Sequence, residues 1–175
     1  MGKTLFKRWF VDFEFPNEEG KPYKSSGGEM VERDQGLIPK DWDILKLSDT
    51  INFIRGIEPG SKNYLEQPTY GSVPFYRVGD LLNDKHVNVY SRLCKGKFVN
   101  FKDILMSFDG SVGRVSIGLE GSFSTGLRKI SWKDNKPRYS YTYYMLKSDN
   151  IQKTVNEHST GTTIMHAGSS IEYLM

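Results

Sequence analysis

The spacing of hydrophobic residues at the start of the chain is that of an α-helix. Within residues 4–13, Leu5 and Trp9 are four positions apart, as are Phe6 and Phe10, so these side chains share one face. A helix this short is marginal in water, where about 12–15 residues are needed. The aromatic face must therefore pack on something. The sequence leaves open whether that is the chain's own domain or a helix outside it.

Hydrophobic periodicity disappears after this segment. Residues 14–36 are rich in Gly, Pro, Ser and charge, which predicts a linker. Ser48 and Asp49 are good helix caps, so we expect a brief helix that contains residues 51–54. The expected organisation is a helix end at 1–13, a linker at 14–36 and one folded domain at 37–175.

Short strand-like runs follow a long polar loop at residues 55–72. Runs of β-branched and aromatic residues between turn residues predict strands at 73–78, 86–93, 97–101, 104–108, 113–118 and 127–132. A helix is expected over residues 140–156. This order of elements indicates an α+β fold with mostly short strands and a few helices. The expected core includes Val73, Phe75, Val78 and Ile104.

Composition and charge narrow the class of protein. Hydrophobic residues make up 37% and charged residues 26%, which is typical of a folded domain and not of a disordered chain. The net charge is +3, but residues 1–35 carry six Lys/Arg against seven Asp/Glu. The positive excess therefore lies in the later part. A basic surface there would suit phosphates, although many solvated surfaces have the same composition.

The cellular setting is indicated by what the sequence lacks. Cys94 is the sole cysteine, so no intramolecular disulfide can form, as expected in a reducing cytoplasm. No apolar run approaches the roughly 20 residues that a membrane helix needs, and the first ten residues do not form a signal peptide. We therefore expect a soluble cytoplasmic protein with no membrane contact.

Residue patterns for catalysis are weak. No phosphate-binding loop or dinucleotide fingerprint is present, so no cofactor is expected. No metal site is expected either, because none of the three histidines has a metal-ligand spacing to another ligand: His86, His158 and His166. Asp12, Glu19 and Lys21 resemble the acidic pattern of metal-dependent nucleases. Because Glu19 and Lys21 lie in the Pro/Gly-rich segment, a nuclease is only the enzyme alternative.

Two loop segments have residues suited to nucleic acid. Residues 109–114, DGSVGR, follow an apolar strand, and residues 122–129 combine small hydroxyl side chains with two cations. Both can be ordinary solvated turns. Alternatively, their backbone amides and Arg114 meet phosphates or base edges. Tyrosines interleaved with Lys and Arg elsewhere in the chain favour the same interpretation without deciding it.

Five segments in order resemble the specificity subunit of type I restriction-modification enzymes. The first, LFKRWFVDFEFPNEEGKPYKSSGGEMVE, resembles the central conserved region, where a long helix ends and the chain crosses to the second recognition domain. The others resemble successive parts of a recognition domain: GLIPKDWDILKL, GSVPFYRVGDL, DILMSFDGSVGRV and GTTIMHAGSSI. Each segment alone is a weak match to the family, but the five occur in the family order and together span nearly the whole chain.

The resemblance implies the fold of the DNA-methylase specificity (target-recognition) domain. It implies a non-catalytic module that reads one half of a split site in double-stranded DNA. It also implies docking to methyltransferase subunits and, through them, to restriction subunits, which use S-adenosylmethionine and ATP. One recognition domain is present, with little helix before Leu5 and none expected after Met175, so the chain resembles a fragment or half-subunit. A homodimer through the N-terminal helix is a further hypothesis.

Under this interpretation, loop cations contact phosphates and loop polar groups read base edges in the major groove. The resemblance does not supply these residues, because they change with the target. The candidates for DNA binding are Lys62, Tyr64, Arg77, Lys85, Ser107, Asp109, Ser111, Arg114, Ser124, Thr125, Arg128, Thr160 and Thr162. For Arg77, an ion pair with Asp80 is an equally good interpretation. A protein-interaction scaffold without sequence preference is the non-enzymatic alternative.

Overall fold

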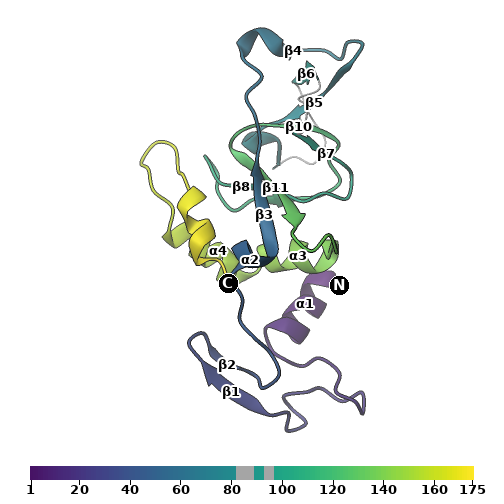
Figure 1. The fold of residues 1–175 in the computed structure, drawn as a ribbon, viewed down its shortest axis with the longest axis vertical. Helices are drawn as coiled ribbons and strands as arrows, with labels where there is room; N and C mark the ends of the chain where they lie inside the picture. Colours follow the sequence, from purple (N-terminus) through teal and green to yellow (C-terminus); the bar gives the residue numbers. More distant parts are fainter. Residues whose placement is uncertain (82–88, 93–96) are drawn as a thin grey trace. The chain divides into compact units, whose positions relative to one another are not determined.

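The computed structural model describes residues 1–81, 89–92 and 97–175 (Figure 1). The chain forms two compact units, Met1–Leu45 and Lys46–Met175, which we call unit 1 and unit 2. Both helices and short strands are present, so the α+β fold expected from the sequence is confirmed.

Unit 1 consists of a helix, turns and a hairpin. The predicted N-terminal helix is present as α1 (Gly2–Phe10), and its Phe10 ring lies 5.9 Å from the ring of Trp42. The antiparallel hairpin joins β1 (Met30–Arg33) to β2 (Gly36–Pro39). The boundary expected between residues 36 and 37 falls inside this hairpin. Phe15 stacks between Tyr23 and Trp42, so residues of the expected linker take part in an aromatic cluster within unit 1.

Unit 2 contains two sheets. The four-stranded sheet is antiparallel and has the order β3 (Ile51–Arg55), β11 (Leu127–Trp132), β8 (Leu105–Ser107) and β9 (Val115–Ser116). The five-stranded sheet has the order β4 (Tyr64–Leu65), β6 (Tyr90–Arg92), β5 (Ser72–Tyr76), β10 (Gly121–Phe123) and β7 (Phe98–Val99). Its β5 and β10 are parallel, and its other neighbours are antiparallel.

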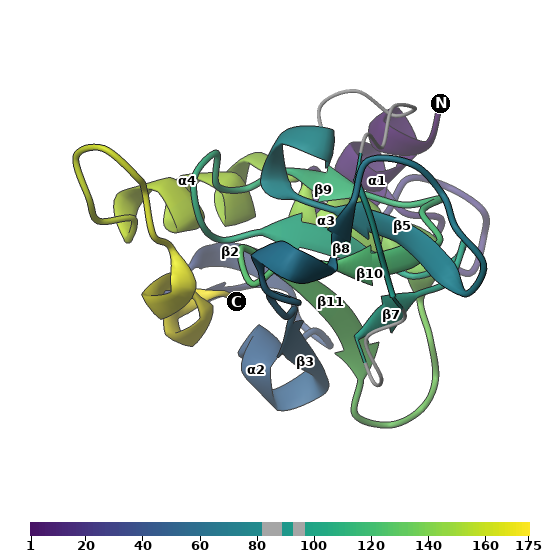
Figure 2. The same cartoon turned by 90° about the horizontal axis from the view of Figure 1, so that it is seen from above.

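Helical segments of unit 2 lie mainly in its last third. They are α3 (Tyr139–Leu146), α4 (Asp149–Glu157) and the 3-10 segment η3 (Gly168–Tyr173). Among the described residues, shorter ones precede them: α2 (Leu47–Thr50), η1 (Ser61–Asn63) and η2 (Val78–Leu81). Figure 1 shows α3 and α4 at the end of unit 2 away from β4, β5 and β6, with β3, β8 and β11 between. Figure 2 shows η3 and the C-terminal end beside α4 and β11.

The four-stranded sheet is covered on both faces, because neighbouring residues of a strand point to opposite sides. Met106 and Ile130 belong to a core that also includes Leu146 of α3 and residues of α4. Leu105 and Leu127 belong to a second core, with side chains from the five-stranded sheet. Of the expected core, Phe75 and Ile104 are fully buried, whereas Val73 and Val78 are half-buried.

Several predicted elements are confirmed. The strand at 127–132 has the predicted bounds, and β7, β8 and β9 lie within predicted runs, whereas β5 begins one residue before the run predicted at 73–78. The strand predicted at 86–93 includes β6, but its residues 86–88 and 93 lie outside the described residues. The polar loop at 55–72 contains η1 and β4.

Three local predictions were wrong or incomplete. Residues 51–54 form a strand, not a helix, because they pair with residues 129–132 of β11. The helix expected at 140–156 is broken at Ser148, whose extended backbone (φ −68°, ψ 151°) begins a second helix. The strand β10 was missed because three residues with a leading glycine have little strand propensity of their own.

Candidate nucleic-acid interface

Three strand ends meet at one end of the four-stranded sheet. Arg128 at the start of β11 is paired with Arg55 at the end of β3 and with Met106 of β8. Neighbouring strands are antiparallel, so the segments that leave them converge there. We call these segments, with the C-terminal segment bonded to them, the loop edge: residues 55–58, 107–114, 124–128 and 158–167.

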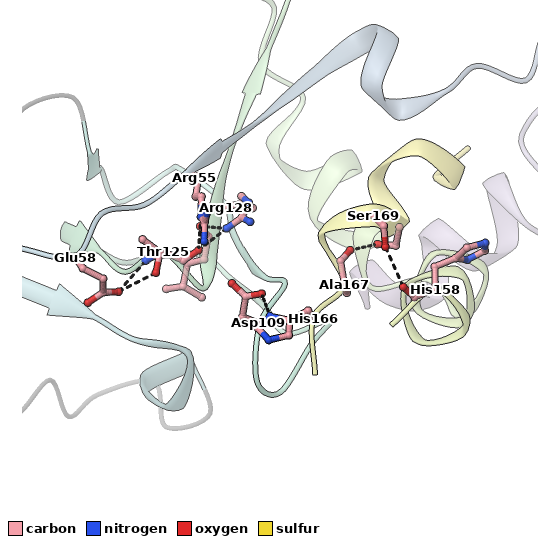
Figure 3. Close-up of polar contacts among 11 residues, drawn as sticks. Arg55, Glu58, Asp109, Thr125, Arg128, His158, His166, Ala167 and Ser169 are labelled. Carbon is pink, nitrogen blue, oxygen red and sulfur yellow. Dashed lines mark hydrogen bonds and ion pairs between the residues drawn. The ribbon is translucent and has the colours of Figure 1, made fainter. Parts of the chain in front are cut away.

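Thr125 is the centre of one bonded group in the loop edge (Figure 3). Its amide and hydroxyl both donate to Oε1 of Glu58, at 3.1 and 3.0 Å, and the other carboxylate oxygen of Glu58 accepts from Tyr64. Gly56 permits this approach, because a Cβ there would collide with the backbone oxygen of Ser124. The segment after β3 is therefore fixed to the turn between β10 and β11.

Two guanidinium groups meet on the other side of Thr125. Nε of Arg55 and Nη1 of Arg128 donate to the same Thr125 carbonyl oxygen, at 3.3 and 2.5 Å. Arg128 is buried and lies over the ring of Phe108, 5.7 Å from its centroid. Burial lowers the pKa of the Arg128 guanidinium, nearby Asp109 raises it, and Arg55 lowers it.

The C-terminal segment is bonded to the residues that follow β8. Nδ1 of His166 lies 2.7 Å from Oδ1 of Asp109 (Figure 3), and the amide of Gly110 donates to the Met165 carbonyl at 2.8 Å. His166 also exchanges backbone hydrogen bonds of 2.7 and 2.9 Å with Thr160. The backbone of this exposed segment is thus held by a hydrogen bond to Gly110 after β8 and by the pair of hydrogen bonds between Thr160 and His166.

A buried serine holds the turn between β8 and β9. The hydroxyl of Ser107 donates to the Ser111 carbonyl at 2.6 Å and accepts from the Arg114 amide at 2.9 Å. Gly110 and Gly113 have positive φ angles of 70° and 80°, which favour glycine. The Arg114 guanidinium donates to the carbonyl of Val78 at 3.2 Å. The turn predicted at 109–114 is therefore present and well ordered by hydrogen bonds.

The structure divides the candidate residues by exposure. The buried ones are Ser107, Ser124 and Arg128. The half-buried ones are Tyr64, Asp109, Arg114 and Thr125. The exposed ones are Lys62, Arg77, Ser111, Thr160 and Thr162. Lys85 lies outside the described residues.

Most candidates lie in the loop edge, but three of the described ones do not. Lys62 lies in η1, and Tyr64 in β4 reaches the loop edge through Glu58. Arg77 follows β5, and its Nε lies 3.8 Å from Oδ2 of Asp80. The Arg77 amide also donates to that carboxylate at 2.7 Å, so the alternative pairing expected from the sequence is present.

Three further residues of the loop edge were missed from the sequence: Arg55, Glu58 and His166. The signal for Arg55 would have been its place at a strand end, but residues 51–54 were assigned to a helix and Arg55 to the polar loop that follows. Glu58 had no local signal, because its partner Thr125 lies 67 positions along the chain. His166 was considered only as a metal ligand.

Within the described ranges, no group of three or more His, Cys, Asp or Glu side chains could hold a metal ion. Of the carboxylates in the nuclease-like pattern, Asp12 pairs with Lys7 at 2.6 Å and Glu19 pairs with Lys21 at 2.7 Å. None of the helices in the described part of the chain is long and apolar enough to cross a membrane.

Comparison of the chain with known protein families gives a match over most of its length. Residues 39–171 match the type I restriction modification DNA specificity domain. The chain belongs to this family. The resemblance seen in the sequence is therefore confirmed, and the match covers most of unit 2 together with the last residues of unit 1.

Individual relatives agree with the family match. The chain is 26% identical over 136 residues to the type I restriction enzyme MjaVIII specificity subunit of Methanocaldococcus jannaschii, and 27% identical over 146 residues to the MjaIX specificity subunit of the same organism. Each alignment covers 77% of this chain but 31% and 33% of the relative. The chain thus spans about a third of the length of these curated relatives.

A solved structure shows the same fold. The HsdS subunit from Thermoanaerobacter tengcongensis superimposes with a TM-score of 0.52 at 16% identity, covering 98% of this chain and 42% of that one. At this identity the likeness concerns the fold alone, and it supports the specificity-domain architecture.

Proposed function

We propose that this chain is a non-catalytic DNA-binding module that reads one half of a split target for a type I restriction-modification enzyme. The observation that carries the proposal is the loop edge: polar side chains from four chain segments, held by hydrogen bonds at one end of a sheet in a DNA specificity domain. Recognition needs such fixed donors and acceptors, because a base edge is read by hydrogen-bond geometry.

The candidate residues divide into three roles. Lys62, Arg77 and Arg114 are the cations proposed to contact phosphates, with Lys85 as a further candidate. The proposed base-reading group contains Tyr64, Asp109, Ser111, Thr125, Thr160 and Thr162. Ser107, Ser124 and Arg128 are buried, so they act by holding the loops in place.

The proposed partners are suggested by the curated relatives, which are longer than this chain. The alignments cover about a third of each curated specificity subunit, so these relatives contain parts that this chain does not align with. We propose that the chain acts with methyltransferase subunits and, through them, with restriction subunits, which perform the reactions. A homodimer through α1 would provide two recognition modules and a symmetric split target.

A selection from random double-stranded DNA tests the proposal. We expect one short enriched sequence for the chain alone or with a methyltransferase subunit, and two copies of it at fixed spacing if the chain dimerises. Binding without any enriched sequence in both conditions would contradict sequence reading. That result would favour the scaffold alternative.

A further inference from the structure

Two like charges face each other across the four-stranded sheet. Arg55 of β3 and Arg128 of β11 are direct partners in the strand register, so their side chains leave the sheet on the same face. Like charges directly opposite each other destabilise a strand pair. Burial is the main cause that lowers the pKa of the Arg128 guanidinium, and the charge of Arg55 lowers it further. Because this pairing lowers stability, we expect the two arginines to have a function that offsets its cost.

The two guanidinium groups share one acceptor. Both donate to the carbonyl oxygen of Thr125. Across the described residues, neither Arg55 nor Arg128 forms an ion pair with a carboxylate. Two carboxylates of the loop edge are engaged elsewhere: Glu58 accepts from Thr125 and Tyr64, and Asp109 lies against His166.

The two arginines differ in their freedom to bind. Arg128 is buried over Phe108 and donates to the carbonyls of Thr125 and Leu127, so its charge is fixed. Arg55 is exposed and uses Nε for its bond to Thr125. Its two terminal nitrogens make no hydrogen bond to any residue that the structure describes. They are the atoms with which arginine binds two oxygens of one phosphate.

We propose that Arg55 and Arg128 form an anion site for a single phosphate of the DNA backbone. Arg55 makes the direct contact, and Arg128 is a positioning residue that supplies fixed positive charge behind it. The bound phosphate offsets the repulsion between the two cations and sets the position of the loop edge along the duplex. This inference rests on the proposed DNA-binding function and adds Arg55 to it.

The test measures DNA affinity of the full chain against salt concentration, with a methyltransferase subunit present in all arms if wild-type binding requires it. The variants are Arg55→Ala, Arg55→Lys and, as a matched control, Arg33→Ala, which removes an exposed arginine of unit 1. The duplexes are the selected sequence, its single-base substitutions and a scrambled sequence.

For Arg55→Ala we expect the slope of log affinity against log salt to fall by about one unit. Affinity should fall by about eightfold at 0.1 M salt, equally for the selected and scrambled duplexes. Arg55→Lys should keep the slope but recover only part of the affinity, because lysine cannot bind two oxygens in a plane. Arg33→Ala should match the wild type. The melting temperature of Arg55→Ala should not fall, since a repulsion has been removed.

Three results would overturn the inference. An unchanged salt slope would show that Arg55 meets no phosphate. A loss confined to one base substitution would make Arg55 a base-reading residue instead. A lower melting temperature with unchanged DNA binding would make it a structural residue. If wild-type binding shows no sequence preference, the proposed function fails, whereas the salt slopes still decide the role of Arg55.

Discussion

Successive cross-strand pairs on one face of the four-stranded sheet differ in their chemistry. Ile51 pairs with Trp132, and Phe53 pairs with Ile130, and these side chains pack in the helix-covered core. The next pair on that face is Arg55 with Arg128. Two residues along the same strands thus separate a packed core from a charged loop edge. The strands stabilise the fold at one end and hold the polar groups of the loop edge at the other.

Substitutions in the helix-covered core should have the largest effect on stability. Ile130 of β11 is fully buried in the helix-covered core, so Ile130→Ala removes packed methyl groups and leaves a cavity. We expect the free energy of unfolding to fall by about 2–5 kcal/mol in a denaturant titration. Ile117→Ala, at an exposed position, should change it by less than about 0.5 kcal/mol. Equal effects at the two positions would contradict the packing described here.

Ser107 is the last residue of β8, where the sheet ends and the turn to β9 begins. Its hydroxyl is buried and bonded to the Ser111 carbonyl and the Arg114 amide. Ser107→Ala should lower the free energy of unfolding by about 1–3 kcal/mol, because a buried donor and acceptor lose their partner. DNA affinity should fall as well, although the side chain cannot reach DNA, because the turn that carries Ser111 and Arg114 loosens.

The matched variant for Ser107 is Ser111→Ala. Ser111 is exposed, so its loss should leave the unfolding free energy within about 0.5 kcal/mol of the wild type. It should instead change the preference at one base of the selected sequence. If both serine variants alter stability and neither alters binding, the turn has no part in recognition.

Substitution of Arg114 tests the loop edge without changing a residue of the core. Its guanidinium donates a hydrogen bond to the Val78 carbonyl, and the residue is half-buried. Arg114→Ala should lower the salt slope of DNA binding by about one unit, which corresponds to one phosphate contact. The double variant with Arg55→Ala should lower it by about two units if the two arginines meet different phosphates. An unchanged slope in Arg114→Ala would remove this residue from the interface.

The sequence predicted the parts of this comparison that depend on local signals. The strand at 127–132 and the glycine-rich turn at 109–114 were both recognisable from neighbouring residues. The family resemblance also came from the sequence, because it rests on ordered segments and not on any one contact.

The pairing of distant segments could not be predicted in this way. Arg55 and Arg128 become partners only when β3 pairs with β11, and the cap-like Ser48 and Asp49 had favoured a helix at that point. Burial was equally hidden: Ser107 and Ser124 have the polarity of loop residues but are enclosed by the sheet and its turns. Hydroxyl groups in a loop sequence do not reveal whether they face solvent or the backbone.

An exposed ion pair outside both regions should give the smallest effect, and it responds to pH. The Arg138 guanidinium and the Lys136 amide hold the pKa of Asp134 at about 2, below its ordinary 3.8. As pH falls, the unfolded chain therefore takes up this proton first. The stabilising contribution is present above about pH 4 and is lost as the pH falls to about 2.

Asp134→Asn isolates that contribution. The melting temperature of the variant should lie slightly below that of the wild type at pH 5, and the two should converge by about pH 2. The difference should also shrink in high salt, since both side chains are solvent-exposed. Its DNA affinity should equal that of the wild type. A pH-independent difference would mean that Asp134 acts through its hydrogen bond to the Lys136 amide and not through its charge.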